Sequence, residues 1–271
     1  MFASILLICG VAVLGMAFRS FKNGLAQRLS VLCILAASFL LGYLPTRSWL
    51  LGLLVVSVWL LLPWLEILTR IRAVRLPIDR IVKPRTPPSH ERFPNLDHLT
   101  QEVEAEAFEV VDDVGCDWDT QRQFLRLFHR ASDQTQAAVC LVDQDDIAFY
   151  YVSLVTRARD GQVFTTWNYP FSYSLKFGPE NHVLRVRAEA SFSSICQAHQ
   201  NFLSRNSVRT DEVPCLDPSQ IQNLLQDDLR SQISHNVAAG LLAPATEGKV
   251  RYTWRGLFYV WLRFLWDLIR S

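Results

Sequence analysis

The first 68 residues contain three apolar runs without a charged side chain, at residues 2–18, 29–44 and 48–65. A helix rises about 1.5 Å per residue and the hydrocarbon core of a bilayer is about 30 Å thick, so a membrane span needs roughly 17 to 25 apolar residues. Each run reaches this length when a few neighbouring residues are added. The pattern therefore predicts a transmembrane segment at residues 1–68, with spans at about 2–18, 26–44 and 48–68.

The third run carries a tryptophan near each end, Trp49 and Trp64. These lie about 22 Å apart along a helix, a separation typical of indole rings at the two membrane interfaces. The second and third runs are separated only by residues 45–47, which predicts an antiparallel hairpin. Ser38 and Gly42 form a pair of small residues on the second span, which we expect to serve close helix packing within the chain.

The positive charges of the connecting segments predict an orientation. The first connection carries Arg19, Lys22 and Arg28, the second carries Arg47 alone, and the stretch after the third run carries six cations (Arg70, Arg72, Arg75, Arg80, Lys83 and Arg85). Because Lys and Arg resist translocation, this pattern predicts an integral plasma (inner) membrane protein with its N-terminus outside and its large domain in the cytoplasm. The alternative is that residues 2–17 form a cleaved signal peptide, but they lack a basic start.

The apolar runs contain no ionisable residue, and this argues against a transporter or a channel. Residues 69–95 are basic and contain five prolines, which predicts an extended linker. We expect the cations at the start of this linker, Arg70, Arg72 and Arg75, to contact the membrane surface, since each Lys or Arg near anionic lipid contributes about 1 kcal/mol. The alternative is an ordinary solvated charged face.

Residues 96–213 are expected to form a cytoplasmic α+β domain. Leu99, Val103 and Phe108 suggest one helix, and a second is expected from a cap at Asp117 or Asp119 to about residue 132. Nearly continuous apolar runs at 137–142 and 147–155 predict a hairpin of two covered strands.

Alternation of apolar and polar residues over 163–177 predicts a further strand, bent or broken at Pro170 and lying at an edge. A short strand at 182–187 and a helix from Ser191 to about residue 205 complete the order. The expected fold is α+β, an antiparallel meander sheet with helices packed on one face.

Residues 214–252 are predicted to form a helical extension that begins at Pro218, and residues 253–271 an amphipathic interfacial helix. The last helix places eight apolar residues on one side and Gly256, Arg263, Asp267 and Arg270 opposite. Its aromatic content favours a helix in the membrane interface, with Trp254, Trp261 and Phe264 in contact with lipid. The alternative is a terminal helix docked on the sheet.

No catalytic, phosphate-binding or metal-binding motif occurs in the chain. Cys196 and His199 lie three residues apart on one predicted helix but fit its apolar face, and His129 with Asp133 is more simply a hydrogen-bonded surface pair. Asp143, Asp145 and Asp146 lack the glycine and the distal glutamate of a calcium loop. We therefore predict no metal and no cofactor, and four free thiols in the domain, at Cys116, Cys140, Cys196 and Cys215.

The alternating segment carries the most distinctive candidate site. Its aromatic residues on an edge strand are suited to a groove for an apolar ligand or for a strand of a partner, and its members are Trp167, Asn168, Tyr169, Phe171 and Tyr173. The alternative is that these rings form the core face of the sheet beneath the flanking helices.

These features favour a non-enzymatic membrane protein, a scaffold or partner of a membrane complex, in contact with the lipid bilayer and with another membrane protein as a further candidate partner. One alternative is a membrane-associated enzyme acting on a lipid or a peptide, with Asn168, His182 and His199 brought together by folding. A second alternative is a tethered ligand sensor. Nucleic-acid binding is disfavoured, because residues 96–271 carry sixteen cations and twenty-three anions.

Overall fold

A computed structural model describes residues 2–21, 24–118, 121–144, 147–246 and 248–270. These residues form two compact units. The helical unit comprises residues 1–74, 172–174 and 251–271, and the sheet unit comprises residues 75–171 and 175–250. Lys22, Asp119, Asp145 and Asp146, which entered the sequence predictions, lie outside the described residues.

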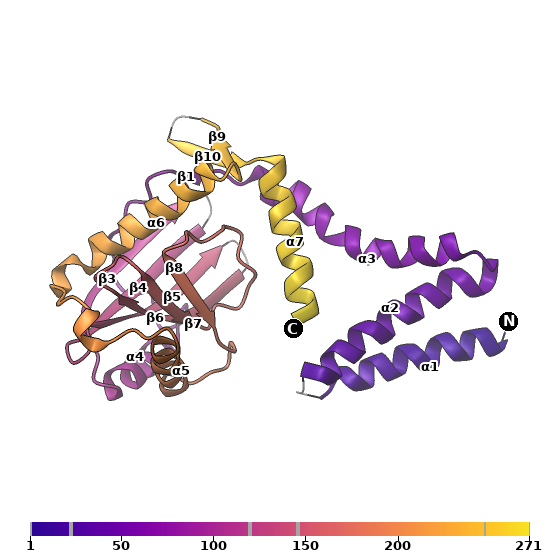
Figure 1. Ribbon diagram of the computed structural model, residues 1–271, viewed down its shortest axis with the longest axis horizontal. Helices are drawn as coiled ribbons and strands as arrows, with labels where there is room; N and C mark the ends of the chain where they lie inside the picture. Colours follow the sequence, from indigo (N-terminus) through magenta and orange to yellow (C-terminus); the bar gives the residue numbers. More distant parts are fainter. Residues whose placement is uncertain (1, 22–23, 119–120, 145–146, 247, 271) are drawn as a thin grey trace. The chain divides into compact units, whose positions relative to one another are not determined.

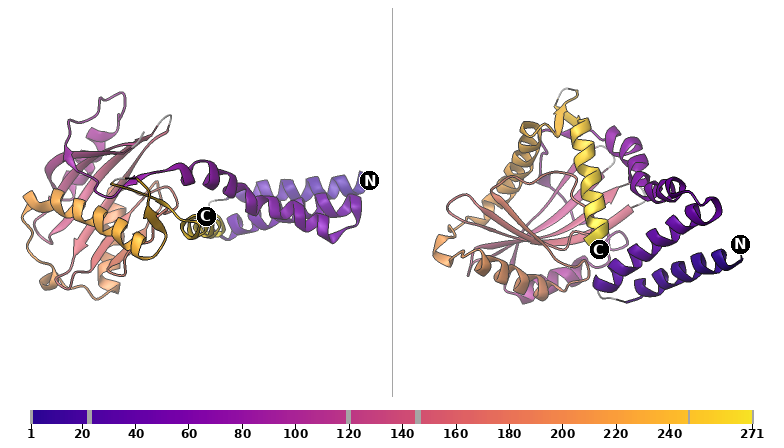
Figure 2. Two further views of the ribbon diagram at one scale, coloured as in Figure 1. Left: turned by 90° about the horizontal axis from the view of Figure 1, so that it is seen from above. Right: turned by 45° about the vertical axis from the view of Figure 1, so that its right-hand side comes forward.

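The helical unit begins with three helices that lie side by side (Figures 1 and 2): α1 (Phe2–Arg19), α2 (Gly24–Thr46) and α3 (Trp49–Thr69). Within the described residues, two helical stretches are long and apolar enough to cross a membrane, Leu25–Thr46 and Trp49–Ala73. The expectation of three such helices is therefore wrong. The corresponding apolar stretch of α1, Ser4–Arg19, is shorter.

The hairpin of α2 and α3 is closely packed, as the pair of small residues predicts. A Cβ atom added at Gly42 would lie 2.5 Å from the carbonyl oxygen of Leu51, so the two backbones meet where only glycine fits. One turn away, the Ser38 hydroxyl accepts a 2.9 Å hydrogen bond from Nε1 of Trp59. Ser38 and Gly42 thus serve packing within the chain.

The C-terminal helix α7 (Trp254–Arg270) belongs to the helical unit and packs on α3. The Trp64 ring of α3 lies 6.4 Å from the ring of Phe258 and 5.6 Å from that of Trp261. Arg263, on the polar side of α7, lies with Cζ 5.1 Å from the centre of the Tyr173 ring. From its sequence, this helix was expected to contact either lipid or the sheet. Its packing on α3 was not expected.

The sheet unit is built on a seven-stranded sheet in the order β2-β3-β4-β5-β6-β7-β8. All neighbouring strands are antiparallel except β7 and β8, which are parallel, so the sheet is mixed and the expected purely antiparallel meander is wrong. The strands are β2 (Lys83–Pro84), β3 (Glu109–Trp118), β4 (Gln121–Arg130), β5 (Thr135–Gln144), β6 (Ile147–Arg157), β7 (Val163–Trp167) and β8 (Asn181–Arg185).

The helix expected from Asp117 to residue 132 is wrong, because these residues belong to β3 and β4. The apolar residues of β4 point alternately to the two faces of the sheet. Phe124 and Phe128 are buried on one face, and Leu125 and Leu127 on the other. A strand covered on both faces produces the same apolar spacing as one side of a helix, and this misled the prediction.

The strand expected over residues 163–177 ends at Trp167, ten residues early. Beyond Trp167, a side-chain contact with β6 takes the place of strand pairing. The Val152 amide donates a 2.6 Å hydrogen bond to Oδ1 of Asn168. The chain then passes over the α6 side of the sheet, where Asn236 binds the backbone of Lys176, and returns as β8 parallel to β7. The edge position therefore belongs to β8 and not to β7.

Helices cover both faces of the sheet, and not one face as expected (Figure 1). The first face carries α4 (Leu96–Ala105) and α5 (Phe192–Arg205), with a core that includes Phe108, Phe128 and Leu154. The second face carries α6 (Ile221–Ala238), with a core that includes Leu125, Cys140 and Ile221. The helix from Ser191 is confirmed, and the Ser191 side chain accepts the Ser194 amide as its cap.

The segment predicted as a linker contains η1 (Ile71–Ala73), β1 (Leu76–Pro77) and β2. Strand β1 joins β10 (Lys249–Tyr252) and β9 (Leu242–Pro244) in a three-stranded sheet. Two short 3₁₀ turns, η2 (Thr210–Glu212) and η3 (Pro218–Gln220), precede α6. The predicted linker thus contributes β1 to the three-stranded sheet and β2 to the seven-stranded sheet.

Candidate functional site: a pocket beneath α6 and an arginine network

A pocket of about 180 Å³ lies between the sheet and α6. We call it the α6 pocket. Leu225 and Leu229 of α6 line one side, while the opposite side is formed by strands β3 to β8. Alternation along the strands supplies these side chains, because every second residue of each strand points toward α6. Among them are Leu125, Cys140, Tyr151, Trp167 and Val183.

One region of the α6 pocket carries polar groups that lack partners. Gln136 is 6% exposed, and its Nε2 forms no hydrogen bond with any described residue. Arg157 binds Asp228 of α6 through both terminal nitrogens, with Nη1 3.0 Å from Oδ1, yet its buried Nε has no hydrogen-bond partner within the described part of the chain. An unsatisfied buried donor costs about 1 to 3 kcal/mol, so such groups need an explanation.

The two thiols in the pocket are poorly suited to nucleophilic chemistry. Burial raises the pKa of Cys140 to about 12, and burial likewise raises the pKa of Cys116. The thiolate is the reactive form of cysteine, and it is disfavoured in both residues. Neither of these two thiols is therefore suited to act as a nucleophile.

An aromatic cluster continues outward from the pocket on the same face of the sheet. Its five rings are Phe149, Tyr151, Trp167, Tyr169 and Phe171. Tyr151 lies 6.0 Å from Trp167 and 5.1 Å from Tyr169, and Phe149 lies 4.7 Å from Phe171. Exposure rises along the cluster, from 8% at Tyr151 to 47% at Phe171. The structure thus brings together three of the five predicted groove residues.

The other two groove residues lie elsewhere. Asn168 is buried, and its amide receives the Val152 N–H and donates to the carbonyl of Ala188 at 3.1 Å. Its role is to fix the end of β7. Tyr173 belongs to the helical unit and lies beneath Arg263.

The three residues considered for an enzyme have separate structural roles. His199 is 1% exposed and forms 2.9 Å hydrogen bonds with the hydroxyls of Thr156 and Thr166. Burial lowers the pKa of His199 to about 4, which keeps the ring neutral near pH 7. His182 stacks on Phe164 with ring centres 4.9 Å apart. Neither these histidines nor Asn168 line the α6 pocket.

The other candidate pairs are also structural. Burial raises the pKa of Cys196 to about 11, and this thiol belongs to the core beneath α5. Asp133 binds Arg130 at 2.9 and 2.7 Å rather than His129. Within the described residues, no three His, Cys, Asp or Glu side chains gather as metal ligands.

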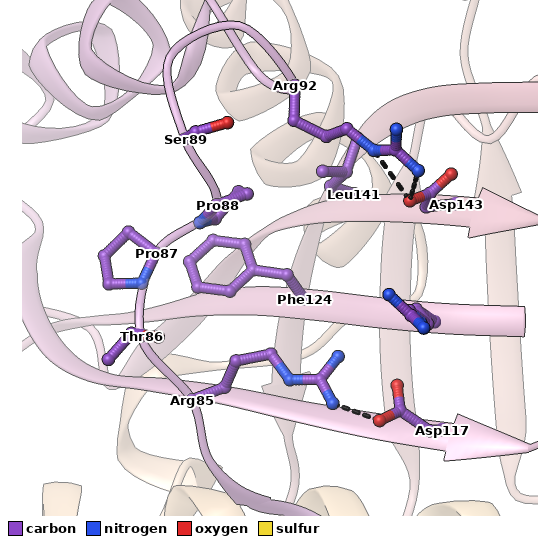
Figure 3. Close-up of a pocket in the computed structure, with 11 residues that line it drawn as sticks. Arg85, Thr86, Pro87, Pro88, Ser89, Arg92, Asp117, Phe124, Leu141 and Asp143 are labelled. Atoms are coloured by element: carbon purple, nitrogen blue, oxygen red, sulfur yellow. Dashed lines mark hydrogen bonds and ion pairs between the residues drawn. The ribbon is translucent and has the colours of Figure 1, made fainter.

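A second pocket lies where the segment after β2 passes over the sheet, and Figure 3 shows its lining. Three arginines and two aspartates alternate across it in the order Arg85, Asp117, Arg122, Asp143, Arg92, and we call this set the arginine network. Asp117, Arg122 and Asp143 are direct neighbours on β3, β4 and β5. Arg85 binds Asp117, and Arg92 binds Asp143 at 2.6 and 2.9 Å.

Arg122 is the exposed centre of this network, and its two described aspartate neighbours are each bound by another arginine. Gly115 gives Arg85 its place, because a Cβ atom at Gly115 would lie 2.5 Å from Arg85 Nε. The ion pair with Asp117 raises the pKa of Arg85. Three cations and two anions among the described lining residues give this part of the pocket a net positive charge, which is suited to an anionic group.

The predicted membrane-contact residues fall in two places. Arg70 lies 3.8 Å from Glu66, both side chains being exposed, and Cζ of Arg72 lies 4.9 Å from the centre of the Trp254 ring. Trp254 is exposed, Trp261 packs on Trp64 and Phe264 is half-buried. These residues belong to the helical unit, whereas Arg75 begins the sheet unit.

The sequence reasoning missed Gln136, Arg157 and Arg122. A polar residue at the start of an apolar run, such as Gln136 before 137–142, was the available signal, but it is normally read as a solvated strand end. Only the position of α6 over this face makes it a buried group.

Comparison with known proteins gave no match: no protein-family model, curated protein sequence or solved structure is significantly similar to the chain.

Proposed function

We propose that this chain is an integral membrane protein without enzymatic activity, which holds its sheet unit at the membrane as a scaffold for another protein. The supporting observation is the apolar surface of the helical unit. In the apolar 18-residue window of each membrane-length helix, only 11% and 12% of the residues are buried. Soluble proteins rarely expose apolar patches larger than a few hundred Å², whereas a bilayer covers such a surface without cost.

The proposed orientation places the sheet unit in the cytoplasm, and it does not depend on whether α1 crosses the bilayer. The connection with Arg19 and Arg28 and the stretch after α3 hold most of the cations, while the α2–α3 connection holds Arg47 alone. With two or with three crossing helices, both cation-rich segments lie on one side. Only the side of the first residues would differ.

Helix α7 supports a second membrane attachment. Four residues spaced by one helical turn, Trp254, Phe258, Leu262 and Trp266, are 47 to 63% exposed. They form an apolar row along the helix, next to the aromatic contact with Trp64. We propose that this row faces lipid.

The arginine network is the surface we assign to a partner. It is concave, net positive and centred on an exposed arginine, which fits a carboxylate-rich segment of another protein. Long-range attraction of an acidic segment would raise the association rate and would weaken with salt.

Cysteine labelling tests the orientation. Cys215 is exposed in the sheet unit, so in a Cys9→Ser background it should react with a membrane-impermeant maleimide only after permeabilisation of the cells. A cysteine introduced by Arg47→Cys should react in intact cells. Labelling of Cys215 from outside, or release of the chain by alkaline carbonate, would contradict the membrane proposal.

Co-purification tests the scaffold role. The full chain, extracted in mild detergent, should retain a partner that is lost with Arg122→Glu and kept with Arg205→Glu, a matched charge reversal at an exposed site on α5. Retention of the same partner by both variants would remove the arginine network from the proposal. Turnover of lipids or peptides by the purified chain would contradict the non-enzymatic function.

A further inference from the structure

We infer that the α6 pocket binds a small apolar molecule, a single ring or a short acyl chain, that carries one neutral carbonyl oxygen. This site is independent of the scaffold proposal, since it lies on the opposite face of the sheet from the arginine network. The inference rests on the size of the pocket, on its apolar lining and on the unpartnered donors at one region of it.

The size of the pocket sets the size of the ligand. Its volume is about 180 Å³, and an apolar cavity of about 150 Å³ in a protein core is known to hold benzene. The α6 pocket therefore accepts one ring with a short substituent. Leu125, Leu229 and Trp167 supply an apolar and aromatic lining for such a ring.

The donors without acceptors determine which polar group the ligand must carry. Gln136 and Val155 are direct neighbours on β5 and β6, and Arg157 lies two residues further along the same face. Side chains in diagonal positions are about 7 to 8 Å apart at their origins, so two long side chains can reach one atom. Among the described residues, neither Gln136 Nε2 nor Arg157 Nε has an acceptor. A single ligand oxygen satisfies this need.

The neighbour of Gln136 on the other side strengthens the case. His129 is paired with Gln136 across β4 and β5, is 7% exposed and has an Nε2 atom without a hydrogen-bond partner among the described residues. Of the buried polar atoms that lack a partner among the described residues, those of His129, Gln136 and Arg157 lie on neighbouring positions of one sheet face. His129 does not line the α6 pocket, so the ligand is assigned to the nitrogens of Gln136 and Arg157, which do.

The charge balance favours a neutral oxygen over a carboxylate. Asp228 already pairs with Arg157, so the guanidinium charge is compensated before any ligand enters. A carboxylate would bring an unpaired negative charge into an apolar site, which is costly. A carbonyl gains the hydrogen bonds without this cost.

The test uses the full chain in detergent micelles, with methyl NMR as the readout and three probes of similar size. Acetophenone has a ring and a carbonyl, cumene has the same shape without the oxygen, and benzoate carries a charge. Acetophenone should shift the methyl signals of Ile221 and Leu229 beside the pocket, but not that of Ile195 in the core on the opposite face. It should bind about fivefold more tightly than cumene and more tightly than benzoate.

Two variants test whether Gln136 causes the tighter binding of acetophenone than of cumene. Gln136→Leu keeps a similar side-chain volume but removes the donor, so the ratio between acetophenone and cumene should fall at least twofold while cumene still binds. Gln144→Leu, at the exposed far end of the same strand, should leave the ratio unchanged. Equal affinities of the wild type for acetophenone and cumene, tighter binding of benzoate, or no shift at Ile221 with any probe would overturn the inference. In the last case the donors bind water alone.

Discussion

The two faces of the seven-stranded sheet are covered by helices but differ in how completely they are filled. Beneath α4 and α5 the described residues form a closed core, and His199, one of its buried polar residues, is hydrogen-bonded through both ring nitrogens. Beneath α6 there is a pocket, and Gln136 and Arg157 retain unpartnered nitrogens. The part of the first face beneath α4 and α5 has the features of a structural core, and we call it the closed face, although Phe124 and Leu141 at its margin also line the pocket of the arginine network. The α6 face has the features of a site for a small ligand.

The difference follows from the residues that each face receives. The closed face takes Phe108, Phe128 and Phe192, large rings that interlock with Leu154 and Ile195. The α6 face takes smaller side chains at its centre, such as Ala138, Cys140 and Ser153. One continuous sheet thus supports stability on one side and leaves space on the other.

Equivalent truncations on the two faces should have the largest effect and should differ. Leu154→Ala, in the closed core with 0% exposure, should lower the free energy of unfolding by about 4 kcal/mol, because a new cavity forms. Leu125→Ala borders the existing pocket and should cost only about 2 to 3 kcal/mol. Urea unfolding followed by near-ultraviolet circular dichroism measures both. Equal losses would contradict the difference between the faces.

Acid should destabilise the closed face through His199. Its pKa of about 4 lies below the ordinary value of 6.5, so the unfolded chain binds more protons between these values. Stability should therefore be complete above pH 6.5 and fall as the pH is lowered to about 4, by on the order of 3 kcal/mol.

Two histidine variants test this assignment. His199→Asn should flatten the pH dependence in this range, although its stability at pH 7 is lower. His98→Gln, at an exposed position on α4, should leave the wild-type slope intact. An unchanged slope in His199→Asn would assign the acid sensitivity to other groups.

The smallest expected difference in stability between the two faces is that between substitutions at two neighbouring alanines on β5. Ala137 points into the closed core and Ala138 toward the α6 pocket. Enlarging Ala137 to Leu should cost about 2 kcal/mol through overpacking, whereas Ala138→Leu should be nearly neutral, because the side chain enters existing space. Ala138→Leu should also abolish the binding of acetophenone. A larger loss of stability in Ala138→Leu than in Ala137→Leu would reverse the assignment of the faces.

The sequence predicted the elements whose periodicity has a single interpretation. The apolar helices α2 and α3, the capped helix α5 and the covered hairpin of β5 and β6 follow directly from their patterns. Strands β3 and β4 were missed, because Phe124, Leu125, Leu127 and Phe128 serve two faces at once and imitate a helix. The parallel position of β8 depends on contacts between Asn236 and Lys176, sixty residues apart, which no local pattern encodes.

The candidate site was predicted only in part for the same reason. Aromatic alternation identified Trp167, Tyr169 and Phe171, which lie in one cluster on the α6 face. It also included Asn168 and Tyr173, since a strand ending at Trp167 was not expected. The unpartnered donors of Gln136 and Arg157 become visible only when α6 covers them.

Xenon binding measures the difference between the two faces most directly. Xenon enters apolar cavities without needing hydrogen bonds, so it reports accessible space alone. In methyl NMR spectra of the full chain under xenon pressure, the signals of Ile221, Leu225 and Leu229 should shift and broaden in a saturable way, while those of Leu154 and Ile195 stay in place. Saturable shifts at Leu154 and Ile195, or none at Ile221, would contradict the division into a closed face and a binding face.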